Sequence, residues 1–192
     1  MTMLHSRNSP LPPLSPALAG QLDAYRPGGF APPAQILREA RKVLPAYAHA
    51  LAPLPERELA GVVEEFAEML NAGVVNPLPG VALQLRCVAL VAACAAVPAL
   101  AWTGHAVRCA LVAFTFFPSA AQLVALLEGQ CGVARATYSR LRLLVAEADQ
   151  RAARERAQDQ RWALWEQQRA LRCGARPVYN PVDNVDYMKN PY

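Results

Sequence analysis

The stretch that decides the fold is Phe114-Thr-Phe-Phe-Pro-Ser-Ala-Ala-Gln-Leu-Val-Ala-Leu-Leu-Glu128. Pro118 disfavours the α conformation at the residue before it, so a preceding helix must end there. Ser119 and Gln122 match a capping box, which begins the next helix. The phenylalanines are expected to fill the angle between the two helices. The pattern predicts a structural helix–corner–helix unit made by Phe116, Phe117, Pro118, Ser119 and Gln122.

Helical periodicity continues on both sides of this corner. Apolar residues recur at three- and four-residue steps in residues 34–51, 55–73, 81–97 and 104–114. Pro45 lies inside the first of these segments, where we expect a kink or a break. The segment 81–97 is nearly all apolar and is predicted to be a buried central helix. Downstream of the corner, nothing interrupts a helix over residues 133–171.

These segments predict an all-α protein, a compact helical bundle with a long C-terminal helix and disordered N- and C-terminal tails. Seven of the 17 prolines fall within residues 10–33, a composition typical of a flexible arm. The expected divisions are a flexible Pro-rich arm, a helical bundle, a long basic helix and a flexible tail, at residues 1–33, 34–132, 133–174 and 175–192.

Charge is distributed unevenly along the chain. The formal net charge is +4, but residues 51–76 hold five Glu against one Arg. Residues 133–176 hold ten Arg against five acids. The sequence therefore predicts an acidic patch and a basic helix on one molecule.

Residues with catalytic chemistry do not cluster in the sequence. The three histidines are isolated, and the acidic residues of helix 55–73 are explained by a solvated face. The only Gly-rich stretch, residues 26–30, lacks the Lys and the strand of a phosphate-binding loop. We therefore expect a protein that is not an enzyme, with no catalytic residue, no cofactor and no metal site.

The cysteines and the N-terminus favour a cytoplasmic location. The five cysteines include no Cys-x-x-Cys pair, and their odd number and apolar surroundings fit reduced, buried thiols. Arg7 is followed by a Pro/Ser-rich run rather than by the apolar block of a signal peptide. An alternative stays open, because residues 87–103 carry no charge: a membrane-associated helical protein that inserts around residues 87–117.

The basic C-terminal helix is the stretch that points to a partner. Its arginines could hold phosphate, and its two tryptophans could stack on bases or enter a protein groove. The opposite interpretation packs the tryptophans onto the bundle and leaves the arginines in water. The candidate contact residues are Arg154, Arg156, Arg161, Trp162, Trp165, Arg169 and Arg172.

A further pattern on this helix indicates self-assembly. Apolar residues follow the alternating four- and three-residue spacing of a coiled coil at Ala134, Tyr138, Leu141, Val145, Ala148 and Ala152. A homo-oligomer through residues 134–152, in a self-assembling structural protein, is thus another alternative.

The corner and the helices before it resemble a family of small helical proteins encoded in prophage regions of proteobacterial genomes. The resemblance rests on residues 97–103, residues 107–114 and the corner at 116–123, within a region of roughly 80 residues. The resemblance implies a non-enzymatic accessory or adaptor protein that binds another protein. Because some members resemble helicase loaders, it also implies a role in DNA replication. Weak nucleic-acid contact through the C-terminal helix is part of this hypothesis.

Overall fold

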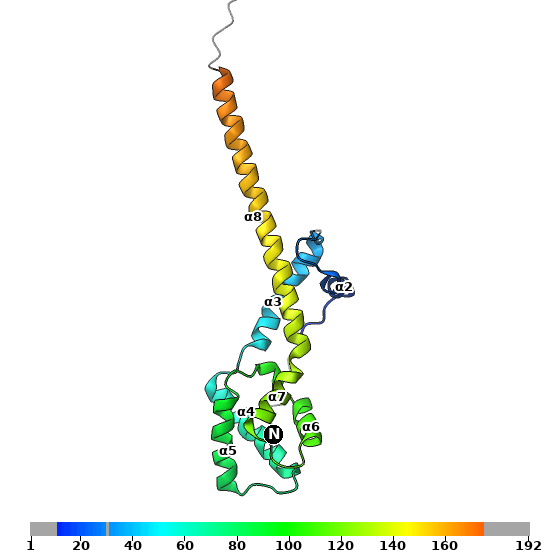
Figure 1. Cartoon of the computed structure of the whole chain (residues 1–192), viewed down its shortest axis with the longest axis vertical. Coiled ribbons are helices and arrows are strands. Elements are labelled where there is room, and N and C mark those ends of the chain that lie inside the picture. Colours follow the sequence, from blue (N-terminus) through cyan, green and yellow to red (C-terminus); the bar gives the residue numbers. More distant parts are fainter. Residues whose placement is uncertain (1–10, 30, 175–192) are drawn as a thin grey trace, which may run out of the picture. The chain divides into compact units, whose positions relative to one another are not determined.

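The computed structural model describes residues 11–29 and 31–174, with side chains as far as Arg172. Within these ranges the secondary structure is helical, with no strand beyond the isolated bridge between Pro53 and Pro98, so the all-α prediction is confirmed. In chain order the elements are α2 (Pro16–Ala24), α3 (Ala34–Leu51), α4 (Glu56–Gly73), α5 (Gly80–Ala93), η1 (Ala99–Ala101), α6 (Gly104–Ala113), α7 (Ala120–Gln130) and α8 (Gly132–Gly174) (Figure 1). The predicted tail 175–192 lies outside the described residues.

The chain divides into two units, Met1–Ala148 and Asp149–Tyr192, and α8 contributes to both. We call the first the globular unit and residues 149–172 of the second the arm. The sequence prediction placed the division between residues 132 and 133. That boundary is wrong because the first turns of α8 are part of a core, where Leu141 and Leu144 are buried.

The larger core of the globular unit is built by α4, α5, η1, α6 and α7. Helix α4 supplies its centre through one apolar stripe, in which Val62, Phe66 and Leu70 are fully buried. The ring of Phe66 meets Trp102 edge-on, with the ring centroids 5.7 Å apart. This geometry is the one that the quadrupoles of aromatic rings favour.

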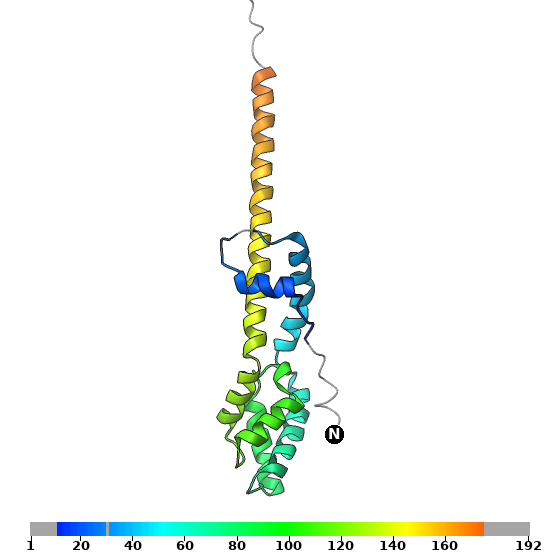
Figure 2. The ribbon, with the colours of Figure 1, turned by 90° about the vertical axis from the view of Figure 1, so that its right-hand side faces the viewer.

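A second core joins α2, α3 and the N-terminal part of α8 (Figure 2). Leu18 and Leu22 of α2 are buried there against the helix pair, and Ser15 caps α2 by accepting a hydrogen bond from the backbone N–H of Leu18 at 3.1 Å. The prediction of a flexible arm at 1–33 is therefore wrong for residues 16–24, and residues 1–10 lie outside the described part. The predicted bundle 34–132 also changes, since α3 belongs to this second core.

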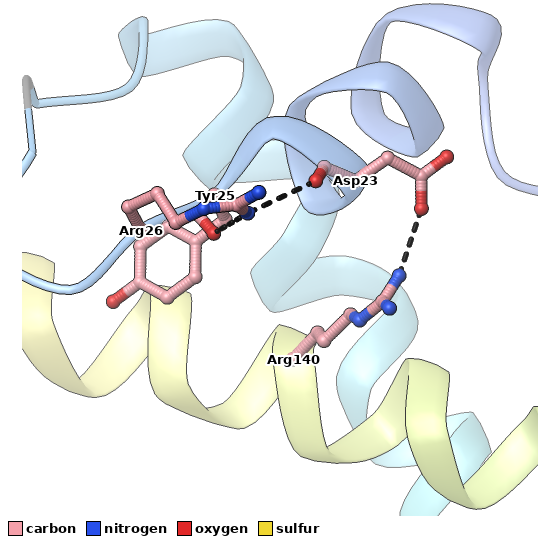
Figure 3. Close-up of polar contacts among 4 residues, drawn as sticks. All are labelled: Asp23, Tyr25, Arg26 and Arg140. Carbon is pink, nitrogen blue, oxygen red and sulfur yellow. Dashed lines mark hydrogen bonds and ion pairs between the residues drawn. The ribbon is translucent and has the colours of Figure 1, made fainter.

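Polar contacts fix the end of α2 to α8 (Figure 3). The guanidinium of Arg140 pairs with the carboxylate of Asp23 at 2.7 Å, and the Tyr25 hydroxyl donates to Glu147. The same carboxylate accepts the N–H of Gly28, whose φ of +79° is one that glycine adopts without strain. The Gly-rich stretch thus serves as a tight turn held by α8.

Two expectations about single helices need correction. Helix α3 continues through Pro45, which lies on its exposed side, so the predicted break does not occur, while the other expectation, a kink, stays a prediction. Helix α5 ends at Ala93 rather than at Val97. The chain turns at Cys94 and reaches η1 through residues 95–98, which lets Val97 and Trp102 enter the core.

Candidate functional site

The corner between α6 and α7 has the predicted capping box. Gln122 donates its backbone N–H to the Ser119 hydroxyl at 3.3 Å, and the Ser119 N–H is bound by the Gln122 side chain at 2.9 Å. Phe117 is half-buried and packs against the larger core, as does Phe114. Phe116 differs from the prediction, because its side chain is 59% exposed and fills no angle between helices.

Helix α5 carries a second apolar face that sequence reasoning missed. Its inner side buries Leu90 and packs Leu83 against the core, but Val81, Leu85 and Val88 are each at least 70% exposed. The prediction of a buried central helix is therefore wrong. Both faces of α5 are apolar, so hydropathy alone could not say which face is the inner one.

A hollow of about 380 Å³ lies between α4 and α5, beside this exposed face. Val88 and Cys87 line it from α5, and Glu64 and Glu68 line it from α4. Within the described part of the chain, neither carboxylate forms an ion pair. Burial and these two negative charges raise the pKa of the Cys87 thiol. We call this surface, with Val81 and Leu85, the α4–α5 groove.

A larger hollow, of about 590 Å³, lies near the C-terminal end of α3 and is lined by His49, Glu58 and Trp102, among others. Within the described residues, the indole nitrogen of Trp102 has no hydrogen-bond partner. That nitrogen is also shielded from solvent, so a molecule in the hollow could not reach it. The unpaired donor is therefore a cost of packing Trp102 in the core, not a binding group.

The arm exposes the tryptophans that the sequence singled out. Trp162 is 60% exposed and Trp165 47% exposed. Their ring centroids lie 5.0 Å apart, and the guanidinium carbon of Arg169 lies 5.4 Å from the centroid of the Trp165 ring. Trp162 donates its indole N–H to Glu166 at 3.1 Å. These local contacts join the two rings, Arg169 and Glu166 in one cluster on the helix surface.

Helical rotation of about 100° per residue sorts the candidate residues into faces. All but one of them fall on a single face about 100° wide, and that set is Arg154, Arg161, Trp162, Trp165, Arg169 and Arg172. We call this set the Arg/Trp stripe. Arg156 lies on another side, where its guanidinium bonds the carbonyl of Ala152 at 3.1 Å. The carboxylates of Glu155, Asp159 and Glu166 lie beside the stripe rather than within it.

Part of the coiled-coil pattern on α8 is packed against other helices of the same chain. Tyr138, Leu141 and Val145 pack against α2 and α3 in the second core. A homo-oligomer through residues 134–152 stays a prediction, and it would have to use the surface that these helices leave uncovered.

The cysteines of the described part of the chain are reduced, as the sequence predicted. Cys94 and Cys131 are buried, and Cys87 and Cys109 are half-buried, all of them as free thiols. Burial raises the pKa of Cys94 to about 11, so this thiol stays protonated at neutral pH.

Among the described residues, no group of three metal-ligating side chains comes together. The described helices include none with the length and apolar character to cross a bilayer.

Comparison with known proteins found no matching family model, no matching curated protein and no matching solved structure. The resemblance of the corner to prophage-encoded proteins therefore stays a prediction, and the function is argued from the geometry of the chain itself.

Proposed function

We propose that this protein is a non-enzymatic helical adaptor that binds another protein through the Arg/Trp stripe of its arm. The observation that carries the proposal is the exposure of Trp162 and Trp165 on the arm, whose side chains are nearly all exposed to solvent. Tryptophan and arginine are the residues most enriched among those that dominate binding energy at protein interfaces. A helix with such a stripe fits a groove on a partner.

Preorganisation supports the same proposal. The two indole rings already contact each other, and Arg169 already lies over Trp165. A partner that binds this arrangement has less side-chain entropy to remove than one that must order free side chains. The stripe is cationic because its arginines lie on one face and the neighbouring carboxylates lie beside that face. The partner surface that it fits is therefore acidic and apolar. Following the resemblance at the corner, a phage replication component is part of this proposal.

The proposal is tested by capture from lysate of the native host, with tagged full-length chain as bait. Trp165→Ala and Arg161→Ala are expected to lose the captured protein. Arg156→Ala is the matched control for Arg161→Ala, since both are exposed arginines of one helix but only Arg161 belongs to the stripe. Equal capture by all of these variants would remove the stripe from the function.

Weak contact with single-stranded nucleic acid is a second candidate for the same stripe. The grouping of the arginines on one face favours it, because phosphate would meet several positive charges there, although the carboxylate of Glu166 borders the face through its bond to Trp162. Each phosphate contact adds about −0.7 to the slope of log K against log[salt] for a single strand, and losing one stacked base costs about 1–3 kcal/mol. Titration of a labelled oligonucleotide with wild type and Trp165→Ala at two salt concentrations tests this; no binding at low salt would exclude it.

A further inference from the structure

The globular unit shows an apolar surface that its own described helices leave uncovered. Val81, Leu85 and Val88 are spaced at four and three residues, so they form a stripe along one side of α5. Scattered exposed apolar residues are ordinary, but a continuous apolar row beside a hollow marks an interaction surface. Val88 belongs to both the row and the hollow, so the two form one continuous surface.

Charge gives this surface a preference for a cationic partner. Glu64 and Glu68 are exposed, one turn apart on α4, and both line the hollow. Their negative charge reaches Cys87 on the opposite wall, where it raises the pKa of the thiol together with burial. Arg86 is the cation of α5, and it lies about 160° around the helix from Val88, away from the groove. The groove is therefore apolar at its floor and acidic on one side.

The Arg/Trp stripe has the complementary character. Two exposed aromatic rings supply apolar surface, and the arginines that flank them supply positive charge. At about 1.5 Å per residue, the stripe from Arg154 to Arg172 is about 27 Å long and the apolar row from Val81 to Val88 about 10 Å, so the groove holds part of the stripe. The donor surface and the receiving surface agree in charge and in apolar content.

We propose that the α4–α5 groove of one molecule binds the Arg/Trp stripe of a second copy of this chain. The inference rests on the proposed function, since it names the protein partner of the stripe. The contact joins two different surfaces, so its repetition builds closed rings or open chains, and the smallest ring is a dimer in which each copy's stripe occupies the other's groove. Opposite charges across the contact make the association stronger at low salt.

Sedimentation velocity of the full chain over a range of concentrations tests this. Wild type is expected to increase in mass with concentration, and the increase should shrink at high salt. Val88→Lys places a cation in the groove and Trp165→Ala removes an aromatic anchor of the stripe. Each is expected to weaken association at least about 30-fold, the effect of losing a dominant interface residue. Val112→Lys is the matched control, because Val112 is an exposed valine on another helix, α6.

Mixing the two variants gives the sharper outcome. Val88→Lys keeps an intact stripe and Trp165→Ala keeps an intact groove, so a mixture can form one intact contact per pair. We expect a heterodimer that grows no further. A mixture that stays monomeric, or wild type that is monomeric at every concentration, would overturn the inference. Association that survives Val88→Lys would overturn it as well and would favour the coiled coil through residues 134–152 instead.

Failure of this inference can be told apart from failure of the proposed function. If the chain is monomeric but captures a host protein that Trp165→Ala loses, the stripe binds another partner and only the inference fails. If Trp165→Ala changes neither self-association nor capture, both fail. Circular dichroism of each variant confirms that its helices are formed before any binding result is interpreted.

Discussion

Two parts of helix α8 have the same secondary structure and opposite surroundings. Up to Ala148 the helix belongs to the globular unit, where Leu144 is 1% exposed. In the arm, Leu164 is 59% exposed. Both leucines sit in a long helix with good intrinsic propensity. Leu144 packs in the core that α2 and α3 form, and Leu164 does not. In this chain a residue can therefore be helical without being part of a core.

We expect the globular unit to supply most of the folding free energy, and we propose the arm as the recognition surface. Packing of apolar side chains is the main source of folding free energy, and the described core residues all precede residue 149. The arm has local contacts on its surface instead, such as the Trp162–Trp165 pair. Changes in the globular unit should therefore move the melting temperature, and changes in the arm should move binding.

The largest expected effect contrasts Leu144→Ala with Leu164→Ala. Leu144 is buried, so its truncation should lower the free energy of unfolding by about 2–5 kcal/mol through lost burial and a cavity. Leu164 is exposed, and its truncation should change that free energy by about 0.5 kcal/mol or less. Urea denaturation followed by circular dichroism measures both. Equal destabilisation by the two substitutions would contradict the division between the parts.

A smaller contrast is expected at the corner. Phe117 is half-buried against the larger core, so Phe117→Ala should cost about 1.5 kcal/mol. Phe116 is mostly exposed, and Phe116→Ala should cost much less. Thermal melts of the two variants check this. If Phe116→Ala instead abolishes capture of a partner at unchanged stability, the corner is a recognition site as well as a structural one.

Loss of the capping box should have an effect of about 1 kcal/mol. Ser119→Ala removes the acceptor for the Gln122 N–H and leaves that donor at the helix terminus without its partner. Ser139→Ala is the matched control, because Ser139 is exposed within α8 and alanine favours helix there. The melting temperature should fall for the first and hold or rise slightly for the second. The same fall in both would mean that the cap contributes nothing.

The smallest expected effect depends on pH. The carboxylate of Glu39 accepts hydrogen bonds from the backbone N–H and the hydroxyl of Ser15, and these bonds lower its pKa below the usual 4.5. The contribution of Glu39 to stability is therefore present above about pH 4.5 and is lost as the pH falls through the lowered value.

Glu39→Gln keeps the shape of the side chain and removes its charge. Its stability should be below that of wild type near neutral pH, and the gap should close in acid. Denaturation curves at a series of pH values measure the gap. A gap that stays constant at all pH values would show that the charge of Glu39 is not what joins α2 to α3.

Much of the fold could be predicted because local signals agree with the structure. The capping box at Ser119 and Gln122 is a short-range pattern, and it is present. Helix α2 was missed because prolines surround it, although Ser15-Pro16 is itself a helix-start signal. The inner face of α5 could not be chosen, since Leu83–Leu90 and Val81–Val88 are both apolar rows at helical spacing.

The candidate site was predicted as a set of residues but not as a surface. Sequence reasoning named the arginines and tryptophans of the arm without sorting them by face. Rotation around the helix separates these residues from the nearby carboxylates and sets Arg156 apart from the rest. The acidic groove between α4 and α5 depends on tertiary packing, so no local pattern could have predicted it.

The most direct test of the role of the arm is Trp165→Ala, with stability and binding measured on the same preparation. Its melting temperature is expected to lie within about 2 °C of wild type, since about 1 kcal/mol corresponds to about 2–4 °C in a chain of this size. Self-association and capture of any host protein that the stripe binds should both be lost. A melting temperature several degrees lower, with association and capture intact, would contradict the division between the arm and the globular unit and make Trp165 a residue of the core.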